Sequence, residues 1–229
     1  MRKKFDQKEF ENFILNNKVI GFFKKPILLK SKRLTHYYIN WRNVTQDVFL
    51  IDKLSDYIIS FVKQKKIDFD CFYGVPEAST KLALIAQYKF AKNSKNFSLG
   101  SHCLPMGRKY PKDHGEPKDR YFIGAPKGKV LILEDVATTG SSIFETLKIL
   151  KKIKVKIVGV LVLTNRMEKT KEGISVKEKI EKKGISFFEM SNVFSLLPKA
   201  CKKFNPKKEI IREIERYYQN YGIEKLKLL

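Results

Sequence analysis

Cysteine is scarce in this chain of 229 residues. The three that are present, Cys71, Cys103 and Cys201, are odd in number and widely spaced, which fits neither a disulfide framework nor a zinc-binding pattern. No apolar run approaches the roughly 20 residues of a membrane-spanning helix. The first residues, MRKKFDQKEFENF, have neither the apolar stretch nor the small-residue cleavage site of a secretory signal. We therefore expect a cytoplasmic protein without a membrane segment.

Arginine is also scarce, although the chain is strongly basic. The formal net charge is +23, yet only eight of the 47 basic residues are arginines, and the lysines are spread over the whole length. Proteins that bind nucleic acids, anionic membranes or phosphorylated small molecules can all be basic. Arginine is the residue favoured for bidentate contacts with bases and phosphates, so diffuse lysine is more typical of a solvated surface. No specific nucleic-acid partner is expected.

The apolar residues predict an α/β fold. Four short apolar runs are typical of buried strands: 69–75, 130–136, 155–165 and 185–190. Helical stretches follow or separate these runs at 81–90, 142–152 and 174–183. This alternation indicates parallel strands joined by crossover helices.

Other elements are expected on either side of this α/β region. Upstream, the pattern predicts helices at 6–16 and 46–64, with small strands within 18–30 and at 36–40. Downstream, an amphipathic helix is expected at 207–222. The sequence has no internal repeat and no long linker, so a single domain covering 1–229 is expected.

Residues 130–142, VLILEDVATTGSS, end a buried strand in a turn rich in hydroxyl groups. In open α/β sheets, ligands bind beyond the carboxyl ends of the strands. Where a strand turns into a helix, unpaired backbone N–H groups and the helix dipole can bind a phosphate. Gly140 allows a close approach of the backbone to the ligand. The hydroxyl donors are Thr138, Thr139, Ser141 and Ser142.

Two carboxylates, Glu134 and Asp135, directly precede this turn. They would repel a phosphate, so we expect them to face another part of the same ligand. Ionised carboxylates only accept hydrogen bonds, which suits vicinal sugar hydroxyls, and a sugar phosphate therefore fits both halves of the motif. The alternative is a capped helix with both acids in solvent. Neither GxGxxG nor GxxxxGK[ST] is present, which disfavours a dinucleotide or nucleoside triphosphate site.

This stretch resembles the 5-phosphoribosyl-1-diphosphate (PRPP) signature of type I phosphoribosyltransferases. The resemblance implies that Glu134 and Asp135 bind the ribose hydroxyls, and that the turn from Val136 and Ala137 to Ser142 binds the 5-phosphate. It also implies a mainly parallel, five-stranded sheet flanked by helices, with a small N-terminal hood at about 1–45. The C-terminal helical tail, at about 205–229, is given no role.

Residues 107–117, GRKYPKDHGEP, gather cationic groups between two glycines, and we call them the cationic loop. Such a loop suits closure over a departing diphosphate, whose charge it would stabilise in a water-excluded site. A solvated lysine loop is the alternative in a chain this rich in lysine. The stretch resembles the RK-x-x-KDHG loop of orotate phosphoribosyltransferases. That resemblance implies PRPP binding by Arg108, Lys109, Lys112 and His114, with Lys112 and Asp135 as catalytic residues.

Further positions resemble the same family. Lys30 matches the lysine of a KSG-type segment and is assigned to PRPP binding. Tyr38 lies at an aromatic position that borders orotate, and Thr138 matches a threonine that touches it. Arg166 follows a strand as the base-site arginine of the family does, which implies pairing with the orotate carboxylate.

The sequence also departs from the family pattern. Glu77 and Ala78 replace a tyrosine–lysine pair that contacts diphosphate, and Lys81 is a candidate for the missing charge. Lys32 replaces a glycine, Asn165 replaces an aspartate, and Ile39 replaces a second aromatic residue.

The resemblance implies a pentosyltransferase that converts orotate and PRPP to orotidine 5′-phosphate and diphosphate in pyrimidine biosynthesis. It implies Mg²⁺ as cofactor, bridging PRPP oxygens, and no side chain of the protein is assigned as a metal ligand. It also implies a homodimer in which each cationic loop serves the neighbouring subunit. Two alternatives stay open: a phosphoribosyltransferase for another base, and a PRPP-sensing regulator that binds nucleic acid.

Overall fold

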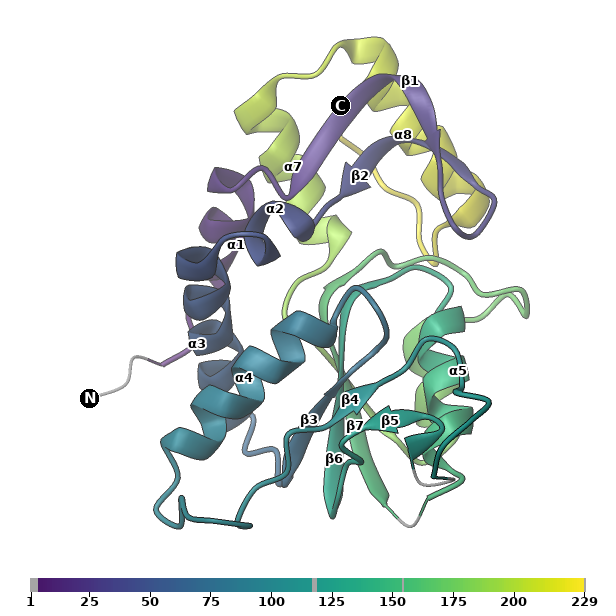
Figure 1. Ribbon diagram of the computed structural model, residues 1–229. Helices are drawn as coiled ribbons and strands as arrows, with labels where there is room; N and C mark the ends of the chain where they lie inside the picture. The colour runs from purple at the N-terminus through teal and green to yellow at the C-terminus, as the bar shows by residue number, and fades with distance from the viewer. Residues whose placement is uncertain (1–3, 117–118, 154, 229) are drawn as a thin grey trace.

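The computed structural model describes residues 4–116, 119–153 and 155–228 (Figure 1). A parallel sheet forms the centre, with strand order β3-β6-β7-β8. Its strands are those predicted from the apolar runs: β3 (Cys71–Gly74), β6 (Lys129–Ala137), β7 (Lys156–Asn165) and β8 (Ser186–Glu189). The connecting helices are α4 (Thr80–Lys92), α5 (Ser141–Leu150) and α6 (Val176–Glu181). The α/β class is therefore confirmed.

In the described part of the chain this sheet has four strands rather than the expected five. The segment between α4 and β6 contains only two short strands, β4 (Met106–Gly107) and β5 (Phe122–Ile123), which pair antiparallel with each other. This segment is polar and charged, and it has no apolar run long enough to fill a strand that is buried on both faces.

Side chains of β6 alternate between two hydrophobic cores. Leu131 and Leu133 belong to the core that includes α3 (Val48–Gln64) and α4, whereas Val130 and Ile132 belong to the core on the α5 and α6 side. This period of two is the geometry of a strand whose faces are both covered. The carboxyl ends of β6 and β7 are consequently fixed between two packed layers.

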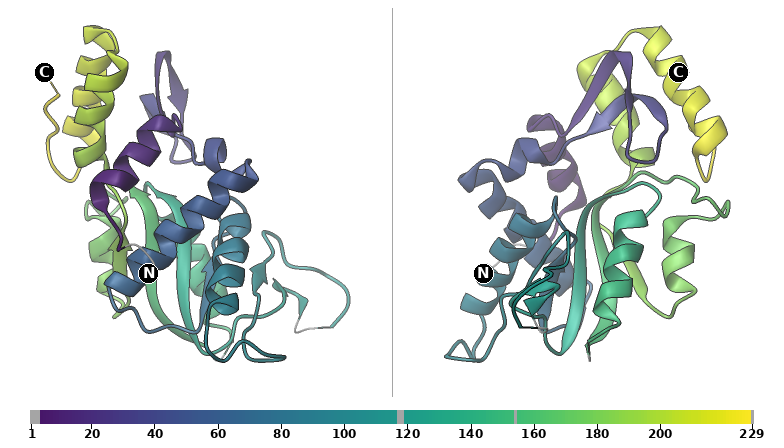
Figure 2. Two further views of the ribbon diagram at one scale, coloured as in Figure 1. Left: turned by 90° about the vertical axis from the view of Figure 1, so that its left-hand side faces the viewer. Right: turned by 45° about the vertical axis from the view of Figure 1, so that its right-hand side comes forward.

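The hood consists of α1 (Gln7–Asn16) and the antiparallel hairpin of β1 (Ile20–Leu28) and β2 (Leu34–Ile39). A short helix, α2 (Arg42–Thr45), leads from the hood to α3. The hairpin lies together with the C-terminal helices α7 (Val193–Phe204) and α8 (Lys208–Tyr221) (Figures 1 and 2). The helix predicted at 207–222 is thus confirmed as α8, which packs on β1 and β2. Residues 1–3 and 229, at the ends of the expected hood and tail, lie outside the described residues.

Helix α7 has no counterpart among the elements predicted from the sequence. It contains Pro198, which weakens the helical signal because proline lacks a backbone donor. The helix nevertheless begins at a capping residue, Asn192, whose side chain accepts a hydrogen bond from the Ser195 backbone N–H. Over the residues that the structure describes, no helix is both long and apolar enough to cross a membrane.

Candidate active site

A cavity of about 700 Å³ lies at the carboxyl end of β6, between the hairpin and the central sheet. Most of the predicted site residues line it. They are Lys30, Tyr38, Lys109, Glu134, Asp135, Val136, Thr138, Thr139, Gly140, Ser141, Ser142 and Arg166. The structure therefore brings together residues from the hood, the PRPP-like signature and the end of β7.

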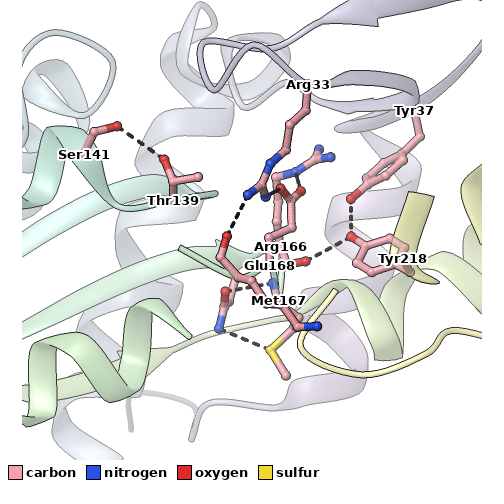
Figure 3. A network of polar contacts seen from close by, with 10 residues as sticks. Arg33, Tyr37, Thr139, Ser141, Arg166, Met167, Glu168 and Tyr218 are labelled. Carbon is pink, nitrogen blue, oxygen red and sulfur yellow. Dashed lines mark hydrogen bonds and ion pairs between the residues drawn. The ribbon is translucent and has the colours of Figure 1, made fainter. Parts of the chain in front are cut away.

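The turn between β6 and α5 has the backbone that an anion site needs. Gly140 adopts φ +73°, in the left-handed region, and a Cβ there would lie 2.9 Å from Val176 Cγ1. Only glycine meets both constraints without strain. Side chains close the turn, because Thr139 Oγ1 lies 3.4 Å from Ser141 Oγ (Figure 3) and Lys30 Nζ donates to Ser142 Oγ over 2.9 Å. Hydroxyls and an ammonium group thus gather at the N-terminus of α5.

The two acidic residues at the end of β6 differ in burial. Glu134 is buried, and its Oε1 accepts hydrogen bonds from Ser79 Oγ (3.0 Å) and the Asp135 backbone N–H (3.2 Å). Asp135 is more open to the cavity, and its Oδ1 accepts from the Val136 N–H over 2.8 Å. Burial, followed by the charge of Asp135, raises the pKa of Glu134 well above its usual range. Burial also raises the pKa of Asp135, and a hydrogen bond with Glu134 opposes this shift.

Charged residues at the start of α4 line another wall of the cavity. Glu77, at the position where the family pattern has tyrosine, accepts a hydrogen bond from Lys109 Nζ over 3.3 Å. Lys81 also lines the cavity, and its Nζ donates to the Thr45 carbonyl over 2.9 Å. Two lysines, Lys81 and Lys109, thus line the same cavity as Glu77.

The cationic loop extends away from the rest of the molecule (Figure 2, left). Lys109 reaches the cavity of its own chain, but Arg108, Lys112 and His114 are not among the residues that line it. Backbone hydrogen bonds hold the loop as an extension of the β4–β5 pair, with Arg108 N donating to Tyr121 O (2.9 Å) and Lys112 N to Arg120 O (2.8 Å). Pro117, the last residue of the loop, lies outside the described residues.

Arg166 also lines the cavity and is almost completely buried, with 1% exposure. Its backbone N–H donates to Ala137 O over 2.9 Å, which ties it to the end of β6. Its Nε donates to Glu168 Oε1 over 2.6 Å, and its guanidinium lies 4.2 Å from the centre of the Tyr37 ring. Glu168 also binds Arg33 Nη1 at 2.6 Å (Figure 3).

Two guanidinium groups, those of Arg33 and Arg166, share the single carboxylate of Glu168. Arg166 Nη2 is buried and has no hydrogen-bond partner within the described chain. The buried group around Arg166 therefore has an excess positive charge and one donor without a partner, and an anionic ligand group at this wall of the cavity would offset the charge. The sequence did not single out Arg33, Tyr37 or Glu168. Tyr37 is next to Tyr38 on β2, but its side chain packs into the core while Tyr38 faces the cavity.

A family model described as "Phosphoribosyl transferase domain" matches residues 115–198. Proteins named orotate phosphoribosyltransferase are 28% identical over 225 residues in Actinobacillus pleuropneumoniae and 29% over 227 residues in Marinobacter nauticus. These alignments cover 94% and 95% of this chain, and 97% and 98% of the relatives. A crystal structure of orotate phosphoribosyltransferase from Francisella tularensis matches with a TM-score of 0.68 at 26% identity, over 93% of this chain and 99% of that chain.

The chain is thus similar to orotate phosphoribosyltransferases over nearly its whole length, and it has the phosphoribosyltransferase fold.

Two departures from the phosphoribosyltransferase pattern have a structural account. Lys32, in place of a glycine, has φ +65°, the left-handed conformation that glycine adopts most easily. Asn165, in place of an aspartate, donates from Nδ2 to Glu189 Oε2 over 2.7 Å and accepts at Oδ1 from the Met167 N–H over 2.9 Å. An ionised aspartate has no donor for Glu189, so the amide suits this neighbour.

Proposed function

We propose that this protein is an orotate phosphoribosyltransferase, which forms orotidine 5′-phosphate and diphosphate from orotate and PRPP in pyrimidine biosynthesis. The observation that carries the proposal is the pairing of two sites in one cavity. The hydroxyl-rich turn with the paired acids lines this cavity, and so does the buried Arg166. Relatives that carry this name align over nearly the whole chain.

The charge at the Arg166 end favours orotate over a neutral base. Orotate differs from uracil by a carboxylate, and that group can accept a hydrogen bond from the unpaired N–H of Arg166. With uracil the donor would stay buried and unpaired, which costs binding free energy. Thr138 and Tyr38, which line the same cavity, would contact the orotate ring.

The reaction is a displacement at the anomeric carbon of PRPP. A bond forms from the base nitrogen to this carbon while the bond to diphosphate breaks, through a state with oxocarbenium character. The turn from Val136 to Ser142 holds the 5-phosphate, and Glu134 and Asp135 hold the ribose hydroxyls. Glu134, whose pKa is raised well above the usual range, can keep a proton in the free site, which reduces repulsion between the two acids and the phosphates of the incoming PRPP.

Mg²⁺ is part of the proposal. Glu77, Glu134 and Asp135 place carboxylate oxygens along the cavity, and oxygen atoms are the ligands that Mg²⁺ prefers. Over the described residues, no cluster of three or more His, Cys, Asp or Glu side chains could hold a metal ion. PRPP would therefore supply most of the ligands, and the ion would neutralise charge on its phosphate oxygens when bound.

We further propose a cytoplasmic homodimer with shared active sites. Lys112, Arg108 and His114 carry the charge expected to stabilise diphosphate, yet they lie outside the cavity of their own chain. A two-fold dimer would let each cationic loop reach the cavity of the partner. Consumption of orotate that requires PRPP tests the proposed activity.

A further inference from the structure

The C-terminal helix α8 ends against the segment that carries Arg166. Tyr218 Oη donates to the Arg166 carbonyl over 2.9 Å. Just beyond the side chain of Tyr218, Lys169 N donates to Tyr221 O over 2.8 Å, and Ile223 N donates to Met167 O over 3.0 Å. Three hydrogen bonds thus fasten residues 166–169 to the end of α8 and to Ile223, which follows its C-cap.

Side chains reinforce this attachment. Tyr218 is fully buried and its hydroxyl contacts that of Tyr37, whose ring lies against the Arg166 guanidinium (Figure 3). Burial raises the pKa of both tyrosines, so both hydroxyls keep their protons. Tyr218 donates its one proton to the Arg166 carbonyl, and Tyr37 is consequently the donor in the contact between the two hydroxyls.

Residues 166–169 include a backbone conformation that is unfavourable in itself. Met167 has φ +55°, a left-handed conformation that is unfavourable for a residue with a side chain. Such a conformation persists where the surroundings hold it. The bonds to Met167 O from Ile223 and to the Arg166 carbonyl from Tyr218 hold the peptide units on both sides of this residue.

We propose that α8 is a positioning element of the base site, acting through Tyr218 on Arg166. This inference rests on the proposed function, because it takes Arg166 as the group that binds the base. Tyr218 is not among the residues that line the cavity, so its effect reaches the substrate only through the placement of Arg166. Loss of its hydroxyl should therefore weaken recognition of orotate and leave the PRPP end of the cavity unchanged.

Tyr218→Phe tests the proposal, since it removes the hydroxyl and keeps the ring. Loss of one buried hydrogen bond predicts an increase of about five- to tenfold in KM for orotate. KM for PRPP and kcat should stay within about twofold, because neither depends on the placement of Arg166. Tyr37→Phe is the paired variant: it removes the neighbouring hydroxyl but leaves the bond from Tyr218 to Arg166, so KM for orotate should change little. Tyr221→Phe, on the same helix, is the control and should match the unmutated protein.

A second variant covers the case in which Tyr218→Phe does not fold. Ile223→Pro deletes the backbone donor to Met167 O, and Gly222 before it is extended (ψ 150°), as a residue preceding proline prefers. Like Tyr218→Phe, this variant should raise KM for orotate and leave KM for PRPP unchanged. The inference is overturned if a folded variant keeps an unchanged KM for orotate, or if KM rises equally for both substrates. Failure of the unmutated protein to use orotate would instead contradict the proposed function.

Discussion

Lys30 Nζ donates to Ser142 Oγ over 2.9 Å, although 112 residues separate the two in the chain. Lys30 lies just after β1 in the hairpin, and Ser142 lies in the first turn of α5. The hydrogen bond joins the hood to the turn that we assign to the 5-phosphate. An ammonium group here adds full charge to the partial charge of the helix N-terminus, so the hood is part of the proposed PRPP site.

Lys30→Ala is expected to weaken PRPP binding by about tenfold or more, because it removes a charged hydrogen-bond donor from the proposed phosphate site. The melting temperature should hardly change, since the side chain is exposed. Titration calorimetry with PRPP and Mg²⁺ measures the effect. Lys25→Ala, an exposed lysine on the same hairpin, is the matched control and should bind PRPP normally. Equal affinities of the two variants for PRPP would show that Lys30 does not bind PRPP.

Glu134→Gln should stabilise the free protein, more at pH 8 than at pH 5. The folded-state pKa of Glu134 is raised, so above the ordinary carboxyl range the folded protein binds more protons than the unfolded chain. Stability therefore falls as pH increases through that range. Glutamine still accepts from Ser79 Oγ but cannot ionise.

The expected gain at pH 8 is on the order of 1 kcal/mol, or roughly 2–4 °C in melting temperature for a chain of this size. Glu145→Gln, an exposed acid on α5, should show no such difference between the two pH values. A gain for Glu134→Gln that is no larger at pH 8 than at pH 5 would argue against the raised pKa. Affinity for PRPP should fall in Glu134→Gln in either buffer, because an acceptor for a ribose hydroxyl is lost.

Subunit mixing tests the shared site. Lys112→Ala and Asp135→Asn should each be nearly inactive alone. After reversible dissociation of an equal mixture, about half of the dimers are hybrids by random pairing, and each hybrid has one site with both defects and one with neither. Roughly a quarter of normal site activity should return if the sites act independently. No recovery despite proven subunit exchange would mean that each loop serves its own chain.

Features encoded in short stretches could be predicted from the sequence. The strands of the central sheet follow from local apolar runs, and the turn after β6 follows from residues that are adjacent in the chain. Lys30 and Arg166, which the family resemblance singled out, also line the cavity. The five-stranded sheet was expected from the resemblance alone, and no fifth apolar run supports it.

Features that depend on tertiary contact could not be predicted. Ser79 acts on Glu134 across 55 residues, and Tyr218 acts on Arg166 across 52 residues, with no local pattern to mark either pair. Glu168 is close to Arg166 in sequence, but its second partner, Arg33, comes from the hood. The position of Lys112 outside its own cavity likewise depends on the path of a long loop.

The most direct test of the account is the loss of orotate absorbance by purified protein, measured with PRPP and Mg²⁺, beside the same assay with uracil. We expect orotate to be consumed only when PRPP is present, with uracil used at least about 100-fold less efficiently because it leaves the Arg166 donor unpaired. Asp135→Asn should abolish the loss. No consumption of orotate, or equal use of uracil and orotate, would contradict the proposed function. Sequence-selective nucleic-acid binding at physiological salt, combined with an absence of turnover, would favour a PRPP-sensing regulator instead.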